Sequence, residues 1–150
     1  MPVDAGATIA GLEALRWRMD EAVRRSVAAA AHLIQGDAMR KAPVGTPGNS
    51  TNTPGDLGRS IDVQGPLGGD GRYEARVGPT VIYGRQRELG GDIYPVMASA
   101  LRFRRFGEVV YRARVHQEPE PYLKPAAIEM RQPIYDAVLA EVRRALGEGG

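Results

Sequence analysis

The residues of this chain that could carry acid–base or metal chemistry are few and scattered. Its two histidines, His32 and His116, stand far apart, and neither belongs to an HExxH or similar spacing that holds zinc. No acidic loop has the twelve-residue pattern that binds calcium. Cysteine is absent, which excludes disulfides, thiol nucleophiles and thiolate metal sites. We therefore expect no metal and no cofactor.

The serines and carboxylates also form no catalytic pattern. A serine nucleophile needs a base within hydrogen-bond reach, and neither Ser60 nor Ser99 lies in a Gly-x-Ser-x-Gly turn. The glycines between residues 65 and 71 lack the strand-then-helix setting of a dinucleotide-binding loop. The sequence therefore predicts that the protein is not an enzyme. The alternative is a hydrolase with a dispersed site that uses Glu88 or His116.

An arginine cluster around Gly107 is the polar feature that stands out. We expect residues 101–106 and 108–115 to form a hairpin that turns at this glycine. Side chains two residues apart on a strand share a face, so the hairpin is predicted to carry one basic patch. The arginines of this patch are Arg102, Arg104, Arg112 and Arg114.

Three roles fit such a patch. It could be a solvated outer face above an apolar inner one. It could pair with acidic side chains of a neighbouring subunit, or it could line a channel and contact DNA phosphates. Aromatic residues are sparse around it, so stacking of single-stranded bases is not indicated.

Composition indicates one ordinary globular domain over residues 1–150. A chain with 43% hydrophobic and 25% charged residues resembles an average soluble protein, and its length leaves room for one core. The formal charge of +2 is smaller than a general nucleic-acid binder carries. The N-terminal sequence has no basic region followed by an apolar run, so no signal peptide is expected. No apolar stretch is long enough to span a membrane.

The elements that must position these residues begin with a long helix. Apolar residues recur at a helical spacing from Ile9 to Ile34, which predicts a helix over 7–42. Such a helix would be roughly 50 Å long. That exceeds what a domain of this size needs, so we expect part of it to pack on something other than its own core. Residues 43–58, rich in Pro, Gly, Ser, Thr and Asn, are expected to be a flexible loop.

A β-rich body over 59–118 and a second helix over 122–146 should follow. Glycine-bounded alternation predicts strands in the first part of the body, then a short helix over 81–89 and a helical turn over 95–101. Pro133 should kink or split the final helix. The expected fold class is α+β, with the C-terminal helix packed on one face of a small, mostly antiparallel sheet.

Several short motifs follow one another in a defined order from the first helix to the last. They are Ala42-Pro43, Gly55, Leu57, Arg59-Ser60-Ile61, Tyr83, Glu88-Leu89-Gly90, Pro95, Ala100-Leu101-Arg102-Phe103 and Pro121-Tyr122-Leu123-Lys124-Pro125-Ala126. Their order resembles that of the neck and minor tail proteins of long-tailed bacteriophages, the head–tail joining or tail-completion family.

This resemblance implies a virion structural protein of the head–tail junction, made in the host cytoplasm and located in the neck or tail. Such a protein would form a homo-oligomeric ring, commonly a hexamer, around the DNA channel. Its partners would be neighbouring neck and tail-tube proteins, with room for non-specific contact with packaged DNA. A tail-terminator ring and a DNA-binding accessory protein are the alternatives. The candidate subunit-interface or DNA-channel residues are Arg102, Arg104, Arg112, Arg114, Glu88, Tyr83 and Tyr122.

Overall fold

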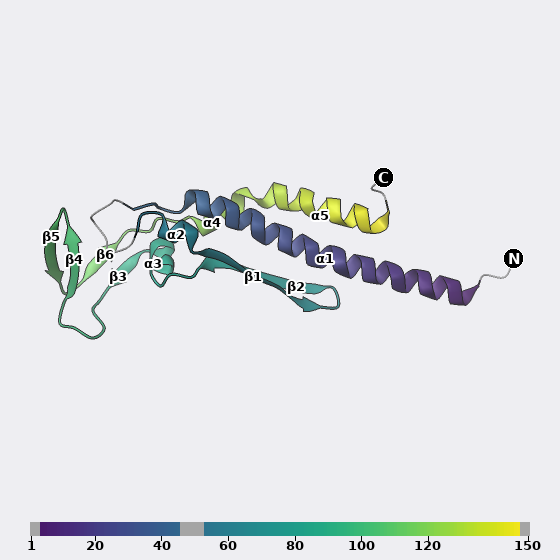
Figure 1. Ribbon diagram of the computed structural model, residues 1–150, viewed down its shortest axis with the longest axis horizontal. Coiled ribbons are helices and arrows are strands. Elements are labelled where there is room, and N and C mark those ends of the chain that lie inside the picture. The colour runs from purple at the N-terminus through teal and green to yellow at the C-terminus, as the bar shows by residue number, and fades with distance from the viewer. Residues whose placement is uncertain (1–3, 46–52, 148–150) are drawn as a thin grey trace. The chain divides into compact units, whose positions relative to one another are not determined.

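The computed structural model describes residues 4–45 and 53–147 and has the predicted α+β composition (Figure 1). Its elements, in chain order, are α1 (Ala5–Lys41), α2 (Asp56–Arg59), β1 (Ile61–Gly69), β2 (Arg72–Pro79), α3 (Gly84–Leu89), β3 (Gly91–Ile93), β4 (Leu101–Arg105), β5 (Glu108–Arg112), β6 (Val115–Gln117), α4 (Leu123–Glu129) and α5 (Arg131–Leu146). The described residues cluster into two compact units. Unit 1 draws on 4–33, 63–76 and 129–147, and unit 2 on 34–45, 53–62 and 77–128. The single domain expected from composition stays a prediction.

Helix α1 begins and ends where its sequence has capping and breaking residues. The Asp4 carboxylate accepts hydrogen bonds from the backbone N–H groups of Gly6 at 3.0 Å and Ala7 at 3.3 Å, as an N-cap does. At the other end, Ala42 precedes Pro43, which disfavours helical geometry in the residue before it. The helix expected over 7–42 is therefore α1.

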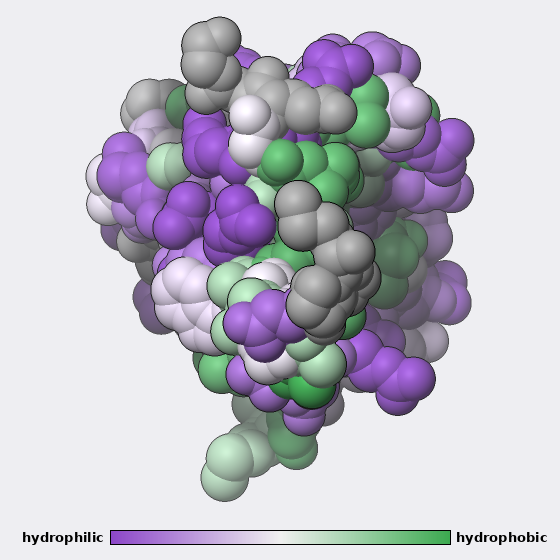
Figure 2. All heavy atoms as spheres, turned by 90° about the vertical axis from the view of Figure 1, so that its right-hand side faces the viewer, coloured by the Kyte–Doolittle hydropathy of each residue, from purple (hydrophilic) through white to green (hydrophobic). Residues whose placement is uncertain are grey.

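The first turns of α1 lie in solvent. Every residue from Asp4 to Ala14 is exposed, including Ile9 at 57% and Leu12 at 62%. Figure 2 faces the side on which α1 begins and α5 ends, and shows hydrophobic residues lying among hydrophilic ones at the surface. The predicted apolar stripe is thus covered within this chain only from Leu15 onward.

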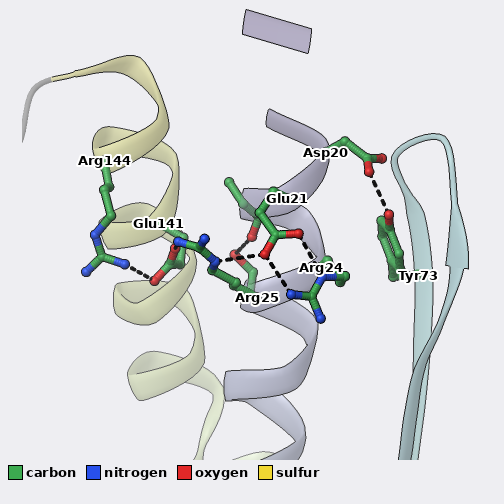
Figure 3. A network of polar contacts seen from close by, with 9 residues as sticks. Asp20, Glu21, Arg24, Arg25, Tyr73, Glu141 and Arg144 are labelled. Carbon is green, nitrogen blue, oxygen red and sulfur yellow. Dashed lines mark hydrogen bonds and ion pairs between the residues drawn. The ribbon is translucent and has the colours of Figure 1, made fainter. Parts of the chain in front are cut away.

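In unit 1, α1 contacts the β1–β2 hairpin on one side and α5 on the other (Figure 3). Toward the hairpin, the Asp20 carboxylate accepts hydrogen bonds from the Tyr73 hydroxyl and the Gly71 backbone N–H, each at 2.6 Å. The Tyr73 hydrogen bond is the main cause that lowers the pKa of Asp20. Asp20 therefore anchors the hairpin turn, where Asp70 and Gly71 both have positive φ, as a two-residue turn of this type requires.

Small side chains make the contact between α1 and α5. Ala22 on α1 and Ala145 on α5 are both buried and line the same shallow groove. Charged residues surround them, because Glu21 pairs with Arg24 and Arg25, and Arg25 also reaches Glu141 at 4.0 Å (Figure 3). Alanine at the centre lets the two helices approach closely, while the ion pairs hold the rim.

The core of unit 2 gathers residues from elements that are distant in sequence. Its buried members are Ala38, Ala42, Leu57, Ile61, Tyr122 and Ala126, from the end of α1, from α2, from β1 and from the start of α4. The Gln35 side-chain amide also donates to the Ile61 carbonyl at 2.9 Å. This core holds the start of α4 against the end of α1.

Three local predictions change, and a fourth is confirmed. The sheet is not continuous, since the described strands form separate two-stranded sheets, β1–β2, β3–β6 and β4–β5. Residues 56–59 of the expected 43–58 loop are helical, and 46–52 lie outside the described residues. The helical turn expected over 95–101 is absent, as 96–100 form bends. The predicted split of the final helix is confirmed, since α4 ends at Glu129 and α5 begins at Arg131. Pro133 thus lies in the first turn of α5, where a proline is tolerated.

Candidate functional site

Glu88 fastens the end of α3 to the start of α4. Its carboxylate accepts three backbone N–H hydrogen bonds, from Tyr122 at 2.7 Å and from Leu123 and Lys124 at 2.9 Å each. The first N–H groups of a helix have no partner within it, and a negative charge at this end is favourable. Glu88 therefore acts as the N-terminal cap of α4, with both carboxylate oxygens occupied.

Tyr122 and Tyr83 belong to the same junction in unit 2. Tyr122 is fully buried, and its hydroxyl donates to the Gly84 carbonyl at 3.2 Å. Burial raises the pKa of Tyr122 to about 12. Tyr83 is half-buried and packs against the same core. The structure thus gives Glu88, Tyr83 and Tyr122 contacts inside the unit, and their role at an interface or channel stays a prediction.

Arg87 and Glu120 also link the end of α3 to the segment before α4. The Arg87 guanidinium pairs with the Glu120 carboxylate at 2.7 Å, and the Glu120 backbone N–H donates to the Arg87 carbonyl at 2.8 Å. The sequence contains one signal that bears on the capping of α4 by Glu88. No Ser, Thr, Asp or Asn, the usual N-cap residues, stands just before α4, so no local side chain of these types is available to cap it.

The β4–β5 hairpin has the predicted turn but not the predicted basic patch. Residues directly opposite in an antiparallel pair share a face. Arg102 lies opposite Tyr111 and Arg104 opposite Val109, which puts these two arginines on one face. Arg112 lies opposite Leu101, on the other face, so the expectation of four arginines on one face is wrong. The two-residue turn after Arg105 fixes this register.

Arg114 lies outside the hairpin, beside β6, and is already paired. Its guanidinium lies 3.3 Å from the Asp92 carboxylate. Asp92 also accepts from His116 Nδ1 at 2.8 Å, its direct partner across β3–β6, and His116 Nε2 lies 3.5 Å from Glu118. The His116 hydrogen bond is the main cause that lowers the pKa of Asp92. The side chains of this cluster are exposed. The sequence did not predict the cluster, because strands of three residues are too short to show a recognisable pattern.

Unit 2 also contains a mainly apolar cavity of about 620 Å³. Its lining includes Leu57, Ile82, Tyr83, Ile93, Leu101, Phe103 and Val115. Arg87 and Arg102 also line it. A cavity of this size and lining can accept apolar side chains of another molecule.

Large apolar side chains remain in solvent in both units. In unit 2, Ile82 is 100% exposed, Val96 96% and Met97 98%. In unit 1, Trp17 on α1 is 71% exposed. Val96 and Met97 are neighbours in the sequence, and contiguous exposed apolar residues mark interaction surfaces more often than isolated ones do.

Within residues 4–45 and 53–147, no three His, Cys, Asp or Glu side chains come together as a metal site would require. None of the described helices has the length and apolarity needed to cross a membrane. Comparison with family models, curated proteins and solved structures finds no match for this chain.

Proposed function

We propose that the protein is a structural component of the phage head–tail junction, which assembles with copies of itself and with neck and tail proteins around the DNA channel. The ordered motifs of the sequence suggest this role. The observation that carries it is the mismatch between a small buried core and the large apolar side chains left in solvent. Tail completion, head–tail connection and tail termination all use such an assembly.

The buried core consists mostly of small side chains. Among the described residues, the buried apolar ones larger than alanine are Leu57, Ile61 and Tyr122. By contrast, Ile82, Val96 and Met97 are almost completely exposed. Burying one such side chain contributes roughly 1.5–3 kcal/mol. Association that covers them would therefore supply stabilisation that this core lacks.

Each subunit has two separate apolar surfaces, and this number suits assembly into a ring. A ring forms when one surface of a subunit binds a different surface of the next subunit and the rotation closes. Unit 2 offers the apolar cavity, and unit 1 offers the exposed first turns of α1 with Ile9 and Leu12. Each subunit thus carries two distinct apolar surfaces, as head-to-tail contacts require.

Native mass spectrometry and negative-stain microscopy test the proposal. We expect ring-sized particles, formed by the protein alone or after addition of connector and tail-tube proteins. Met97→Asp should weaken assembly without changing the circular dichroism spectrum, because Met97 is 98% exposed. Ser99→Asp is the matched control, since it adds the same charge at an exposed residue of the same segment.

A chain that stays monomeric in every mixture would contradict the proposal. Equal effects of the two aspartate variants would show that added charge, rather than loss of the apolar side chain, weakens assembly. Co-assembly with the connector or with the tail tube separates the head–tail position from the tail-terminator position.

A further inference from the structure

The β4–β5 hairpin carries unpaired positive charge. Residues 101–112 contain four arginines and one glutamate, a net charge of +3 in a chain whose formal charge is +2. The rest of the chain is therefore slightly negative. We call the four residues Arg102, Arg104, Arg105 and Arg112 the arginine hairpin.

The arginine hairpin differs from most arginines elsewhere in the described chain. Arginines of other segments pair with carboxylates, as in Arg16–Asp70, Arg24–Glu21, Arg40–Asp37, Arg59–Asp56, Arg76–Glu74, Arg87–Glu120, Arg114–Asp92 and Arg144–Glu141. All four members of the arginine hairpin are exposed, and none forms an ion pair with a described residue. Arg112 donates only to the neighbouring Tyr111 carbonyl, and Arg105 lies 5.4 Å from the centre of the Phe106 ring.

The register distributes this charge over both faces of a narrow ribbon. Arg102 and Arg104 occupy one face, and Arg105 and Arg112 lie on the other at its two ends. A flat acidic protein surface can meet only one of these faces. The major groove of double-stranded DNA admits a two-stranded β-ribbon between walls of phosphate backbone. The guanidinium group also matches phosphate with two parallel hydrogen bonds.

We propose that the arginine hairpin binds the phosphate backbone of double-stranded DNA without sequence preference. This inference rests on the proposed function, because a ring around the DNA channel brings subunits close to the duplex. The exposed carboxylate Glu108 lies opposite Arg105 and is the one acidic group of the hairpin sequence. The other three arginines, Arg102, Arg104 and Arg112, have no acidic residue directly opposite them in the ladder.

The test is a fluorescence anisotropy titration of the full chain with a labelled mixed-sequence duplex over a series of salt concentrations. Each neutralised phosphate contributes about −0.9 to the slope of log affinity against log salt. Replacing all four arginines of the arginine hairpin by Gln should weaken binding at least about tenfold and make that slope shallower by about 0.9 for each phosphate that the variant no longer binds. Both strands of the hairpin keep their alternating pattern in this variant.

A matched control removes the same charge from other places. The control replaces Arg72, Arg85, Arg131 and Arg143 by Gln; all four are exposed and form no ion pair with a described residue. We expect the control to retain most of the slope. An equal reduction in both variants, or no reduction in the hairpin variant, would overturn the inference. So would equally tight binding of polyglutamate and duplex at the same salt, since the ligand would then be an acidic polypeptide.

Native mass spectrometry of the same proteins separates this inference from the proposed function. Rings that form but bind DNA independently of the arginine hairpin would refute the DNA contact alone. Hairpin-dependent DNA binding by a chain that never assembles would refute the ring and leave the contact standing.

Discussion

Glu88 caps the helix that begins at Leu123, 35 positions further along the chain. Three N–H groups of the first turn converge on one carboxylate. Two sequence motifs that are separated by β3 to β6 are therefore one structural unit. Glu88-Leu89-Gly90 supplies the cap, and Pro121-Tyr122-Leu123 supplies the helix start.

Glu88→Ala should lower the free energy of unfolding by about 0.5–2 kcal/mol, the range that loss of an N-cap costs. Urea denaturation followed by circular dichroism measures the change. Glu13→Ala is the control, since Glu13 is exposed on the early part of α1. Equal stability of the two variants would show that the cap contributes little. Glu88→Gln should fall between wild type and Glu88→Ala, as an amide oxygen can still accept.

Tyr122 should titrate above the ordinary range of a phenol. Burial raises its pKa to about 12 from the ordinary value of 10.0. The contribution of this group to stability is full below pH 10 and is lost as pH rises through the folded value. Ultraviolet difference spectra should therefore show a late phenol transition that Tyr122→Phe removes. The hydrogen bond to Asp20 also raises the pKa of Tyr73, so Tyr73→Phe identifies the contribution of that residue. A variant that keeps the late transition would assign it to another tyrosine.

Tyr122→Phe should also cost about 0.5–1.5 kcal/mol, the usual net value of one hydrogen bond. Tyr122→Ala should cost about 3–5 kcal/mol, because it leaves a cavity in a small core. Thermal or urea unfolding of the two variants gives both values.

The hydrogen bond from the Gly71 N–H to the Asp20 carboxylate should control exchange at the β1–β2 turn. Asp20→Asn weakens the acceptor for the Gly71 N–H, so hydrogen exchange at the Gly71 amide should become faster. Tyr73→Phe should have a smaller effect at Gly71, because it leaves that hydrogen bond in place. Unchanged exchange in Asp20→Asn would mean that the turn geometry alone protects this amide.

Asp20 also makes unit 1 sensitive to acid. Its pKa lies below the ordinary value of 3.8, chiefly through the Tyr73 hydrogen bond. A lowered folded pKa means that the stabilising contribution is full above about the ordinary value and is lost as pH falls through the folded one. Carboxyl NMR titration should find the pKa of Asp20 closer to its ordinary value in Tyr73→Phe. An unchanged pKa in that variant would assign the shift to Gly71.

The Asp92–His116 pair offers a similar measurement in unit 2. His116→Gln should raise the pKa of Asp92 toward 3.8, since the His116 hydrogen bond is the first cause of its lowering. Arg114→Gln should raise it less, as the Arg114 charge is a smaller cause. The reverse order in an NMR titration would make the arginine the dominant partner.

Sequence patterns predicted the elements whose signals are local. The apolar spacing and Pro43 define α1, and Gly107 marks the turn of the β4–β5 hairpin. Register was harder to predict, because it depends on turn length. With two residues in the β4–β5 turn, Arg105 pairs with Glu108, and every later pair joins an even to an odd position. Arg112 thus falls on the face opposite Arg102.

Long-range contacts leave even weaker signals in the sequence than register does. Three-residue strands such as β3 and β6 have too few side chains to show alternation, so the Asp92–His116 pair was not foreseen. The role of Glu88 was not foreseen either, because a cap from a distant segment has no fixed spacing from the helix it serves. Exposure of the first turns of α1 agrees with the expectation that this helix is longer than its own core requires.

Each of the two units is built from several separate segments of the chain, which limits how the protein can be divided. The borders between the units fall inside α1, β1, β2 and α4, after Leu33, Asp62, Arg76 and Ile128. A cut at any of these borders would break a regular element and its backbone hydrogen bonds. Neither unit is therefore a transferable module that could be excised at a loop and expressed alone. Insertions or fusions that preserve the protein belong in loops within a unit rather than at these borders.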